Sequence, residues 1–222
     1  MLHPRLFFLF ALYATLSSFS IAMADDCSNP SPLVKNTPDY RIRITYPILS
    51  TATATCQIHQ WLDGNLLIFN NELKRRNSLH HWKGEYLATP VLVRSRKTET
   101  AVLTIYEFTG GANGMTHTQT FTLDRTQGRF IGWLGLFNPG SDWYHAVYPY
   151  VLSATQPYHT DAKWFEHGAG PNPDLYQRFA LDQKNLVLYF EPIAIAPHSA
   201  GTITVRIPLD QLKPILNPLY LP

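Results

Sequence analysis

The first half of the chain changes from an alternating to a helical pattern of apolar residues. From Tyr40 to Tyr46 apolar and polar residues alternate strictly, which predicts a strand with Ile42 and Ile44 on one face. Apolar residues then recur at steps of 4, 4, 3 and 4, at Ile58, Leu62, Leu66, Phe69 and Leu73. Because this spacing aligns side chains on one stripe, it predicts a helix from about Cys56 to Arg76.

Strand patterns follow the helix. We predict strands over Tyr86–Arg96, Thr98–Phe108 and Met115–Leu123, and then a turn at 124–128 that leads into a short strand at 130–133. The strand from Thr98 to Phe108 carries apolar residues at both alternating positions. Such a strand is covered on both faces, so we expect it in the centre of its sheet.

The C-terminal half predicts shorter elements. They are a helix at 142–152 that Pro149 limits or kinks, a long loop at 159–174, a hairpin of 178–181 and 186–190, a strand at 201–207 and a helix at 210–216 broken by Pro214. Strands dominate and helices are inserted singly. The fold class expected is therefore α+β with mostly antiparallel sheets.

Residues 1–24 have the three parts of a cleavable secretory signal. A thin basic start precedes an apolar run from Leu6 to Leu16, and small residues at Ala22 and Ala24 fit a cleavage site. The alternative is an uncleaved membrane anchor, but the run is shorter than the roughly 20 residues of a bilayer span. We expect a mature protein that begins at Asp25, is periplasmic or secreted, and is not embedded in a membrane.

The two cysteines of the chain are Cys27 and Cys56. In an oxidising compartment two cysteines of an exported chain most often form one bridge, which here would tie the N-terminal tail to the start of the helix. The alternative is a pair of thiols used for catalysis or metal binding. Neither cysteine lies in a CxxC or Cys/His motif, so the bridge is the interpretation that we favour.

Charge and histidine spacing exclude several classes of function. Loss of Arg5 with the signal takes the net charge from +2 to 17 − 16 = +1, which argues against a nucleic-acid partner. No histidine spacing matches a zinc pattern, so we expect no metal and no cofactor. His198, Ser199 and Glu191 could be part of a hydrolase site, but neighbouring residues of a strand point to opposite faces and no GxSxG motif occurs.

The loop Gly110-Gly111-Ala112-Asn113-Gly114 lies between two predicted strands. We interpret Gly110, Gly111 and Gly114 as a tight structural turn, because positive φ is costly for other residues. The functional alternative is a ligand-facing loop in which Asn113 and His117 project polar groups.

Residues 143–165 are unusually aromatic. Most of these side chains are expected in the core, and an exposed subset would form a surface for sugar or protein. Together with the glycine loop and the long loop, they give seven candidate binding residues: Asn113, His117, Trp143, Tyr144, His159, Trp164 and His198.

Several motifs resemble one family of exported bacterial domains. YRIRITYPIL at 40–49 and AVLTIYEFTGG at 101–111 are similar to a PdaC-type segment, while DRTQGRF, WLGLF and the PIAIAPHSAG block before VRIPLDQL are similar to the C-terminal domain of the anti-sigma factor RsiV. The resemblance implies an RsiV/PdaC-like α+β fold with a tail at 25–37 and lobes at 38–110 and 111–222. The family loop reads glycine-glycine-alanine-histidine-glycine, and Asn113 stands here in place of that histidine.

The resemblance also bears on function, since relatives of this module bind lysozyme. No anti-sigma region, membrane span or polysaccharide deacetylase domain is recognised beside the module, so those activities are not carried over. We expect a noncatalytic cell-envelope module that binds lysozyme or peptidoglycan. The alternatives are an extracytoplasmic hydrolase, either an esterase or a glycan-active enzyme, and a purely structural envelope protein.

Overall fold

The computed structural model describes residues 27, 29–77, 81–158 and 162–221, so the expected signal at 1–24 lies outside the described residues. The larger sheet has six strands in the order β1-β2-β3-β4-β5-β6. Only β2 and β3 pair in parallel, and the other neighbours are antiparallel. The strands are β1 (Leu33–Asn36), β2 (Tyr40–Ile44), β3 (Gly84–Arg94), β4 (Thr98–Phe108), β5 (Met115–Asp124) and β6 (Arg129–Phe130).

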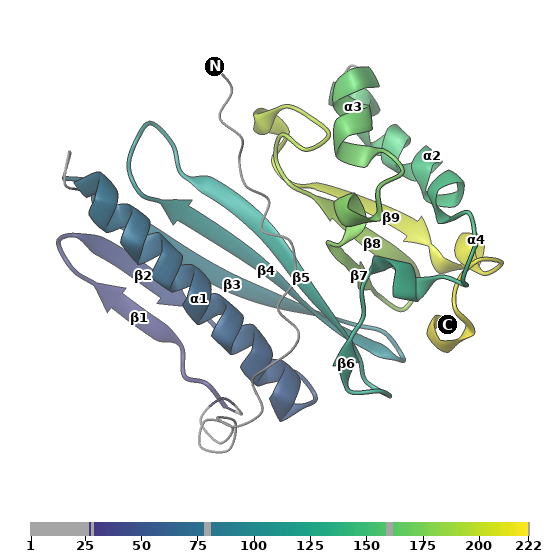
Figure 1. Ribbon diagram of the computed structural model, residues 1–222, viewed down its shortest axis with the longest axis horizontal. Coiled ribbons are helices and arrows are strands. Elements are labelled where there is room, and N and C mark those ends of the chain that lie inside the picture. Colours follow the sequence, from purple (N-terminus) through teal and green to yellow (C-terminus); the bar gives the residue numbers. More distant parts are fainter. Residues whose placement is uncertain (1–26, 28, 78–80, 159–161, 222) are drawn as a thin grey trace.

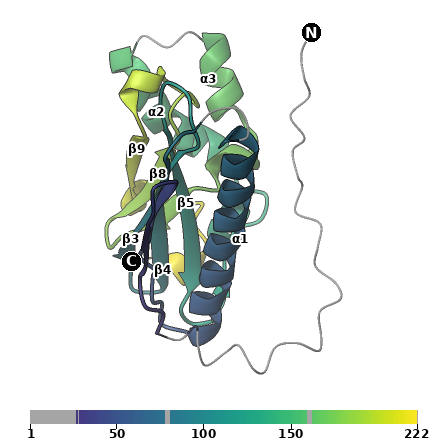
Figure 2. The same cartoon turned by 90° about the vertical axis from the view of Figure 1, so that its left-hand side faces the viewer.

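One long helix, α1 (Ala52–Asn77), covers one face of this sheet (Figure 1 and Figure 2). Four residues of the predicted stripe are buried in it: Ile58, Leu62, Phe69 and Leu73. The hydroxyl of Thr51 accepts a hydrogen bond from the backbone N–H of Ala54 at 3.3 Å, and this N-cap starts the helix four residues before Cys56. The basic residues 74–76 lie in its last turn, where cations offset the helix dipole.

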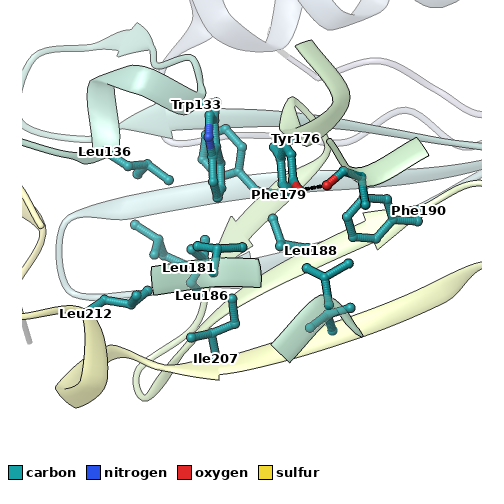
Figure 3. Packing of buried hydrophobic residues seen from close by; sticks show 14 of the residues in the cluster. Trp133, Leu136, Tyr176, Phe179, Leu181, Leu186, Leu188, Phe190, Ile207 and Leu212 are labelled. Atoms are coloured by element: carbon teal, nitrogen blue, oxygen red, sulfur yellow. Dashed lines mark hydrogen bonds between the residues drawn. The ribbon is translucent and has the colours of Figure 1, made fainter. Parts of the chain in front are cut away.

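The second lobe packs a smaller antiparallel sheet against short helices (Figure 1). Its elements are β7 (Phe179–Leu181), β8 (Asn185–Phe190), β9 (Ile203–Pro208), α2 (Trp143–Thr155), α3 (Ala162–Ala169), α4 (Leu209–Leu212) and five 3-10 turns: η1 (Trp133–Leu136), η2 (Gln156–Tyr158), η3 (Pro173–Tyr176), η4 (His198–Ala200) and η5 (Pro218–Tyr220). Trp133 is fully buried in its core and stacks on Tyr176 at 5.2 Å. The Tyr176 hydroxyl donates to the carbonyl of Ala169 at 2.7 Å (Figure 3).

The two lobes meet on the face of the large sheet that points away from α1. Val102 of β4 packs there against Ala180 and Val187 of the small sheet. Buried threonines of β5 add hydrogen bonds: Thr122 donates to the Phe179 carbonyl at 2.9 Å, and Thr120 accepts from the Phe179 N–H at 3.0 Å. These side-chain contacts tie the face of β5 to the start of β7.

The fold class predicted from the sequence is confirmed, and β4 is indeed central in its sheet with residues buried on both faces. Four local predictions are wrong. The expected loop at 159–174 contains α3, because Phe165 and Ala169 are spaced to bury one helical face. The expected strand at 130–133 ends at Phe130, since Trp133 turns into the core in a 3-10 helix. The other two corrections concern the ends of α2 and α4.

Pro149 does not end α2, which continues to Thr155. The helix is held from its start by Asp142, whose carboxylate accepts from the backbone N–H of His145 at 3.2 Å, and by burial of Val147 and Val151. The terminal helix is shorter than expected, because α4 ends at Leu212, two residues before Pro214. β1 lies within the segment expected to be a tail, where a short edge strand pairs with β2.

Candidate functional site

Part of the large sheet is left open on the face away from α1. Cross-strand register puts Arg41, Glu85 and Phe108 on this face, side by side on β2, β3 and β4. The small sheet covers the same face only around Val102, further along β4. The remainder, formed by β1, β2 and the adjoining ends of β3 and β4, is hollowed.

The first hollow lies over β1 and β2 and has a volume of about 430 Å³. Arg41 and Arg43 line it and are exposed, since they alternate with the buried Ile42 and Ile44. Arg41 Nη1 lies 3.3 Å from Glu85 Oε1. Lys83 donates to the side-chain oxygen of Asn36 at 2.9 Å, an uncharged acceptor, so its positive charge is not neutralised there.

The second hollow shares Lys83 and Glu85 with the first and has a volume of about 370 Å³. Its further lining comes from β4 and the glycine loop: Tyr106, Phe108, Ala112, Asn113 and Gly114. We call the two hollows together the open-face groove. It combines cations, one carboxylate, two amides and aromatic rings. Sites for polar organic ligands have this mixture of apolar surface and a few polar groups.

Trp82 lies beside the groove, next to Phe108. Its ring is 39% exposed and meets Phe108 edge-on at 6.2 Å. Its backbone N–H donates to Asn77 Oδ1 at 3.1 Å, and the Asn77 amide returns a hydrogen bond to the Trp82 carbonyl at 3.1 Å. These hydrogen bonds fix the backbone of Trp82, and its exposed ring offers a flat surface on which a sugar can stack.

The glycine loop closes the groove for steric reasons. Gly110 has φ +113°, and a Cβ on it would lie 2.6 Å from Cδ1 of Trp82. A Cβ on Gly114 would lie 2.4 Å from the Tyr106 ring. Glycine is therefore needed in this turn both for its backbone conformation and because two aromatic rings, those of Trp82 and Tyr106, pack against it. Asn113 at the tip of the turn is exposed.

His117 lies apart from Asn113, in a second polar cluster that we call the lobe junction: Glu107, His117, Arg178 and Glu191. His117 Nδ1 lies 3.7 Å from Glu191 Oε1, and Arg178 Nη2 lies 3.2 Å from the same oxygen. Arg178 also donates from Nε to the carbonyl of Thr118 at 2.7 Å. The cluster thus ties the free edge of β5 to the turn that follows β8.

The charged groups of the lobe junction shift one another's pKa values. The Glu191 carboxylate raises the pKa of His117 against the opposing effect of burial. Burial opposes ionisation of Glu191, but His117 and Arg178 together hold the pKa of Glu191 below its ordinary value. Burial raises the pKa of Glu107. These pKa shifts are typical of charged groups that pair with each other for a structural role. In the described part of the chain, none of the four side chains forms a hydrogen bond with a hydroxyl group that could act as a nucleophile.

The turn after β8 is strained. Ile193 has φ +74°, a costly conformation for a β-branched residue. Helix α3 clamps this turn at Gly168, where a Cβ would lie only 1.8 Å from the carbonyl oxygen of Ala194. Glu191 is thereby held at the lobe junction by the packing of α3.

The other candidate residues do not gather at the groove. Trp143 and Tyr144 are half-buried in the C-terminal core, with Trp143 packed on Trp133 at 5.4 Å and on Tyr176 at 5.0 Å. Trp164 belongs to α3, but its side chain, like the whole of His159, lies outside the described residues. His198 is exposed in η4 (His198–Ala200).

The hydrolase constellation considered from the sequence is not assembled. Between residues 162 and 221, the side chain of His198 forms no hydrogen bond with Ser199 and no ion pair with Glu191. Glu191 is engaged by His117 and Arg178 instead. Across the described ranges no group of three or more His, Cys, Asp or Glu side chains is placed to hold a metal ion, and no helix is long and apolar enough to cross a membrane.

The two cysteines lie next to each other. Cys27 is buried at 7% exposure, and burial together with a hydrogen bond to Cys27 raises the pKa of the Cys56 thiol to about 11. The predicted bridge thus remains a prediction, with the two sulfur atoms placed close to each other.

Sequence reasoning missed Trp82, Arg41 and Arg43. The arginines could have been found, because strict alternation in β2 places them opposite Ile42 and Ile44. Trp82 carries no periodic signal. Only the pairing of β3 with β4 brings it to Phe108 and the glycine loop.

The fold and the groove define an α+β protein of two packed lobes with an open sheet face. The model of a family described as "Protein of unknown function (DUF3298)" matches residues 135–210, most of the C-terminal lobe. Two solved structures of this family share the fold. One is a DUF3298 family protein from Pseudomonas aeruginosa PAO1, with TM-score 0.60 and 19% identity over 90% of this chain and 99% of that chain. The other, from Bacteroides fragilis, has TM-score 0.53 and 14% identity over 80% of this chain and 84% of its own.

Curated relatives are also similar. "Peptidoglycan-N-acetylmuramic acid deacetylase PdaC" of Bacillus subtilis is 22% identical over 194 residues, which are 85% of this chain and 42% of that protein. "Immunogenic protein MPT64" of Mycobacterium tuberculosis is 26% identical over 121 residues, 54% of this chain and 53% of its own length. An esterase of the same species is 25% identical over 118 residues, 53% of this chain and 52% of its own. The chain spans about half the length of these relatives, or less.

Proposed function

We propose that this protein is a noncatalytic module of the bacterial cell envelope that binds peptidoglycan in the open-face groove. The observation that carries the proposal is the composition of the groove. Phe108 in the groove and the exposed Trp82 ring beside it offer apolar surface for a sugar, and Arg41, Arg43 and Lys83 line the groove with positive charge.

Peptidoglycan has both kinds of group that this groove would recognise. Its glycan consists of N-acetylated sugars with flat apolar faces, and its short peptides end in carboxylates. Guanidinium groups pair with carboxylates in a bidentate geometry, and the indole ring supplies contact area at low cost in conformational entropy. Similarity to a protein named for peptidoglycan supports the same ligand.

The charge of the groove also favours one of the two expected partners, peptidoglycan, over the other, lysozyme. Lysozyme is strongly basic, so a binder would have to present carboxylates to it. The groove presents Glu85 as its single carboxylate, and Arg41 already pairs with it at 3.3 Å. Peptidoglycan is therefore the partner that we propose for this surface. An exported location, periplasmic or secreted, is part of the proposal and rests on residues 1–24.

A hydrolase is the alternative, and similarity to an esterase over about half of the chain is what favours it. Its most direct test is turnover. We expect no hydrolysis of p-nitrophenyl acetate or of acetylated glycan by the purified protein above the rate of a His198→Ala, His117→Ala double variant. A rate that this double variant abolishes would establish the hydrolase instead.

The binding test uses sedimentation of the mature protein with insoluble peptidoglycan. We expect saturable co-sedimentation, and we expect Trp82→Ala and the double variant Arg41→Gln, Arg43→Gln each to weaken it at least about tenfold, the loss of one good contact of about 1.4 kcal/mol. Lys213→Gln is the matched control, because this exposed lysine lies at the opposite lobe and pairs with Asp210. Equal binding by all four proteins, or none by any, would refute the groove as the site.

A second arm repeats the titration with lysozyme in solution by calorimetry. We expect no saturable heat, because both surfaces are basic. Saturable binding that Arg41→Gln, Arg43→Gln leaves unchanged would replace peptidoglycan by lysozyme as the partner and move the site to another surface. A purely structural envelope protein would bind in neither arm.

A further inference from the structure

A separate pocket lies between the two lobes, at the other end of the large sheet from the open-face groove. Figure 1 shows the end of the β3–β4 hairpin reaching the second lobe near the C-terminus. The pocket has a volume of about 290 Å³ and three sources of lining: the hairpin residues 94–97, the turn residues Asp182 and Gln183, and the apolar side chains of Leu209, Tyr220 and Leu221. We call it the hairpin-tip pocket.

The hairpin tip is a fixed platform. The Ser95 hydroxyl accepts from the backbone N–H groups of Lys97 and Thr98, at 3.3 and 3.0 Å, and lies 2.8 Å from the Thr98 hydroxyl. The Lys97 carbonyl accepts from the N–H of Arg125 at 2.9 Å. The backbone that carries Arg96 and Lys97 therefore has little freedom, so these two cations are presented at the pocket at low cost in backbone entropy.

The charges around the pocket do not cancel. Arg94 is neutralised by the buried Glu99, at 2.7 Å, and Asp182 is neutralised by Arg206, at 3.3 Å. Asp182 also accepts from the N–H groups of Lys184 and Asn185, at 2.7 and 2.6 Å. In the described part of the chain neither Arg96 nor Lys97 has a carboxylate partner, so two positive charges remain uncompensated.

The side of the pocket formed by residues 209, 220 and 221 is apolar. The Tyr220 hydroxyl donates to Asp124 at 2.9 Å, away from the pocket, so Tyr220 lines it with carbon atoms together with Leu209 and Leu221. The Gln183 amide is the one uncharged polar side chain of the opposing turn that lines it. Two cations facing an apolar wall select an amphiphilic anion, because a fully hydrated ion gains nothing from the wall.

We propose that the hairpin-tip pocket is a second binding site, for a small organic anion whose carboxylate or phosphate pairs with Arg96 and Lys97 while its apolar part packs on Leu209 and Leu221. The volume of about 290 Å³ is at the lower end of the range of ligand pockets and suits a small molecule. Because the lining comes from both lobes, the bound anion holds the lobes together and stabilises the folded state. The site is independent of the peptidoglycan groove.

The test titrates the mature protein with benzoate, with phenyl phosphate and with the neutral isostere benzamide, followed by calorimetry and by thermal unfolding. We expect saturable binding and a rise in Tm with at least one anion, and neither with benzamide. Which anion binds more tightly distinguishes a carboxylate ligand from a phosphate ester. The double variant Arg96→Gln, Lys97→Gln should weaken binding at least tenfold.

Lys184→Gln is the matched control, because it removes a cation from the neighbouring turn that does not line the pocket. It should leave the dissociation constant within about twofold. An equal loss in this control would show a general charge effect and overturn the site, as would binding of benzamide or an absence of saturable binding. Arg96→Gln alone serves as a second variant, and its Tm without ligand should equal that of the parent because Arg96 is exposed.

Discussion

His117 on β5 lies 3.7 Å from Glu191, measured between Nδ1 and Oε1, and this contact joins the large sheet to the strained turn after β8. Arg178 reaches the same carboxylate at 3.2 Å, and Glu107 carries a further charge near the imidazole. Two residues 74 positions apart in the chain thus bring the lobes together through an imidazole, the side chain whose ordinary pKa of about 6.5 lies nearest to neutral pH.

The first prediction concerns pH. The Glu191 carboxylate raises the pKa of His117 in the folded state, so the contact stabilises fully below the unfolded pKa of about 6.5 and is lost as pH rises through the folded pKa. Since the His117 side chain is 43% exposed, we expect the loss to be at most about 1 kcal/mol. Urea unfolding at pH 5.5 and at pH 8 measures it.

The control is His117→Gln, which should remove the part of the decrease over this window that comes from His117, while the part from Glu107 should remain. Glu191 affects stability separately, at acid pH. Because its pKa is lowered in the folded state, its contribution to the free energy of unfolding is lost as pH falls through that folded pKa. Burial raises the pKa of Glu107, so its contribution is also lost as pH rises, above its ordinary value of 4.5. A variant that kept the full decrease between pH 5.5 and pH 8 would assign it to a group other than His117.

The second prediction concerns the close approach of α3 to the turn after β8. Gly168→Ala places a Cβ 1.8 Å from the carbonyl oxygen of Ala194, so backbone must move. We expect a loss of roughly 1–3 kcal/mol in the free energy of unfolding, as for overpacking in a core. Gly64→Ala is the opposite case, because nothing lies within 4 Å of that position in α1, and it should gain about 0.5–1 kcal/mol. Chemical denaturation of both variants checks this, and similar effects of equal sign would contradict it.

The third prediction concerns the hydroxyl of Thr122, which lies between the lobes. It donates to the Phe179 carbonyl at 2.9 Å and accepts from the Thr100 hydroxyl at 3.1 Å, and Thr122 is only 3% exposed. Thr122→Val keeps the shape but leaves two buried polar groups unsatisfied, which should cost about 1–3 kcal/mol. Thr122→Ser keeps the hydroxyl and should cost less. Denaturant midpoints of the two variants decide the point, and the reverse order would indicate that the methyl group matters more than the hydrogen bonds.

The fourth prediction is the bridge between Cys27 and Cys56. Closing a loop of about 30 residues should stabilise by roughly 3–4 kcal/mol in the chain-entropy model. Protein purified without reductant should show no thiol reactive toward Ellman's reagent in denaturant, and reduction should lower its free energy of unfolding. Cys27→Ser, Cys56→Ser should match the reduced protein. Two reactive thiols in protein freshly isolated from an oxidising compartment would exclude the bridge.

Local patterns were sufficient for the main elements of the first lobe. Alternation in β2 and the stripe from Ile58 to Leu73 determined the strand and α1, because burial of one face is the same requirement in sequence and structure. Thr51 lies outside that stripe, and its capping hydroxyl extends the helix. Helix α3 was missed since its signal is only two buried residues, Phe165 and Ala169.

The candidate sites depended on contacts that no local pattern contains. The sequence by itself determined the α+β class, the strand β2 with Ile42 and Ile44 on one face, and the tight glycine loop, because alternation, helical spacing and positive φ are properties of neighbouring residues. Tertiary structure alone decided that Trp82 lies against Phe108 and Gly110, that His117 meets Glu191, and that Arg96 and Lys97 face an apolar wall from the other lobe. The physical reason is that sheet pairing and lobe packing bring together residues far apart in the chain, and the free energy of those contacts depends on both partners at once.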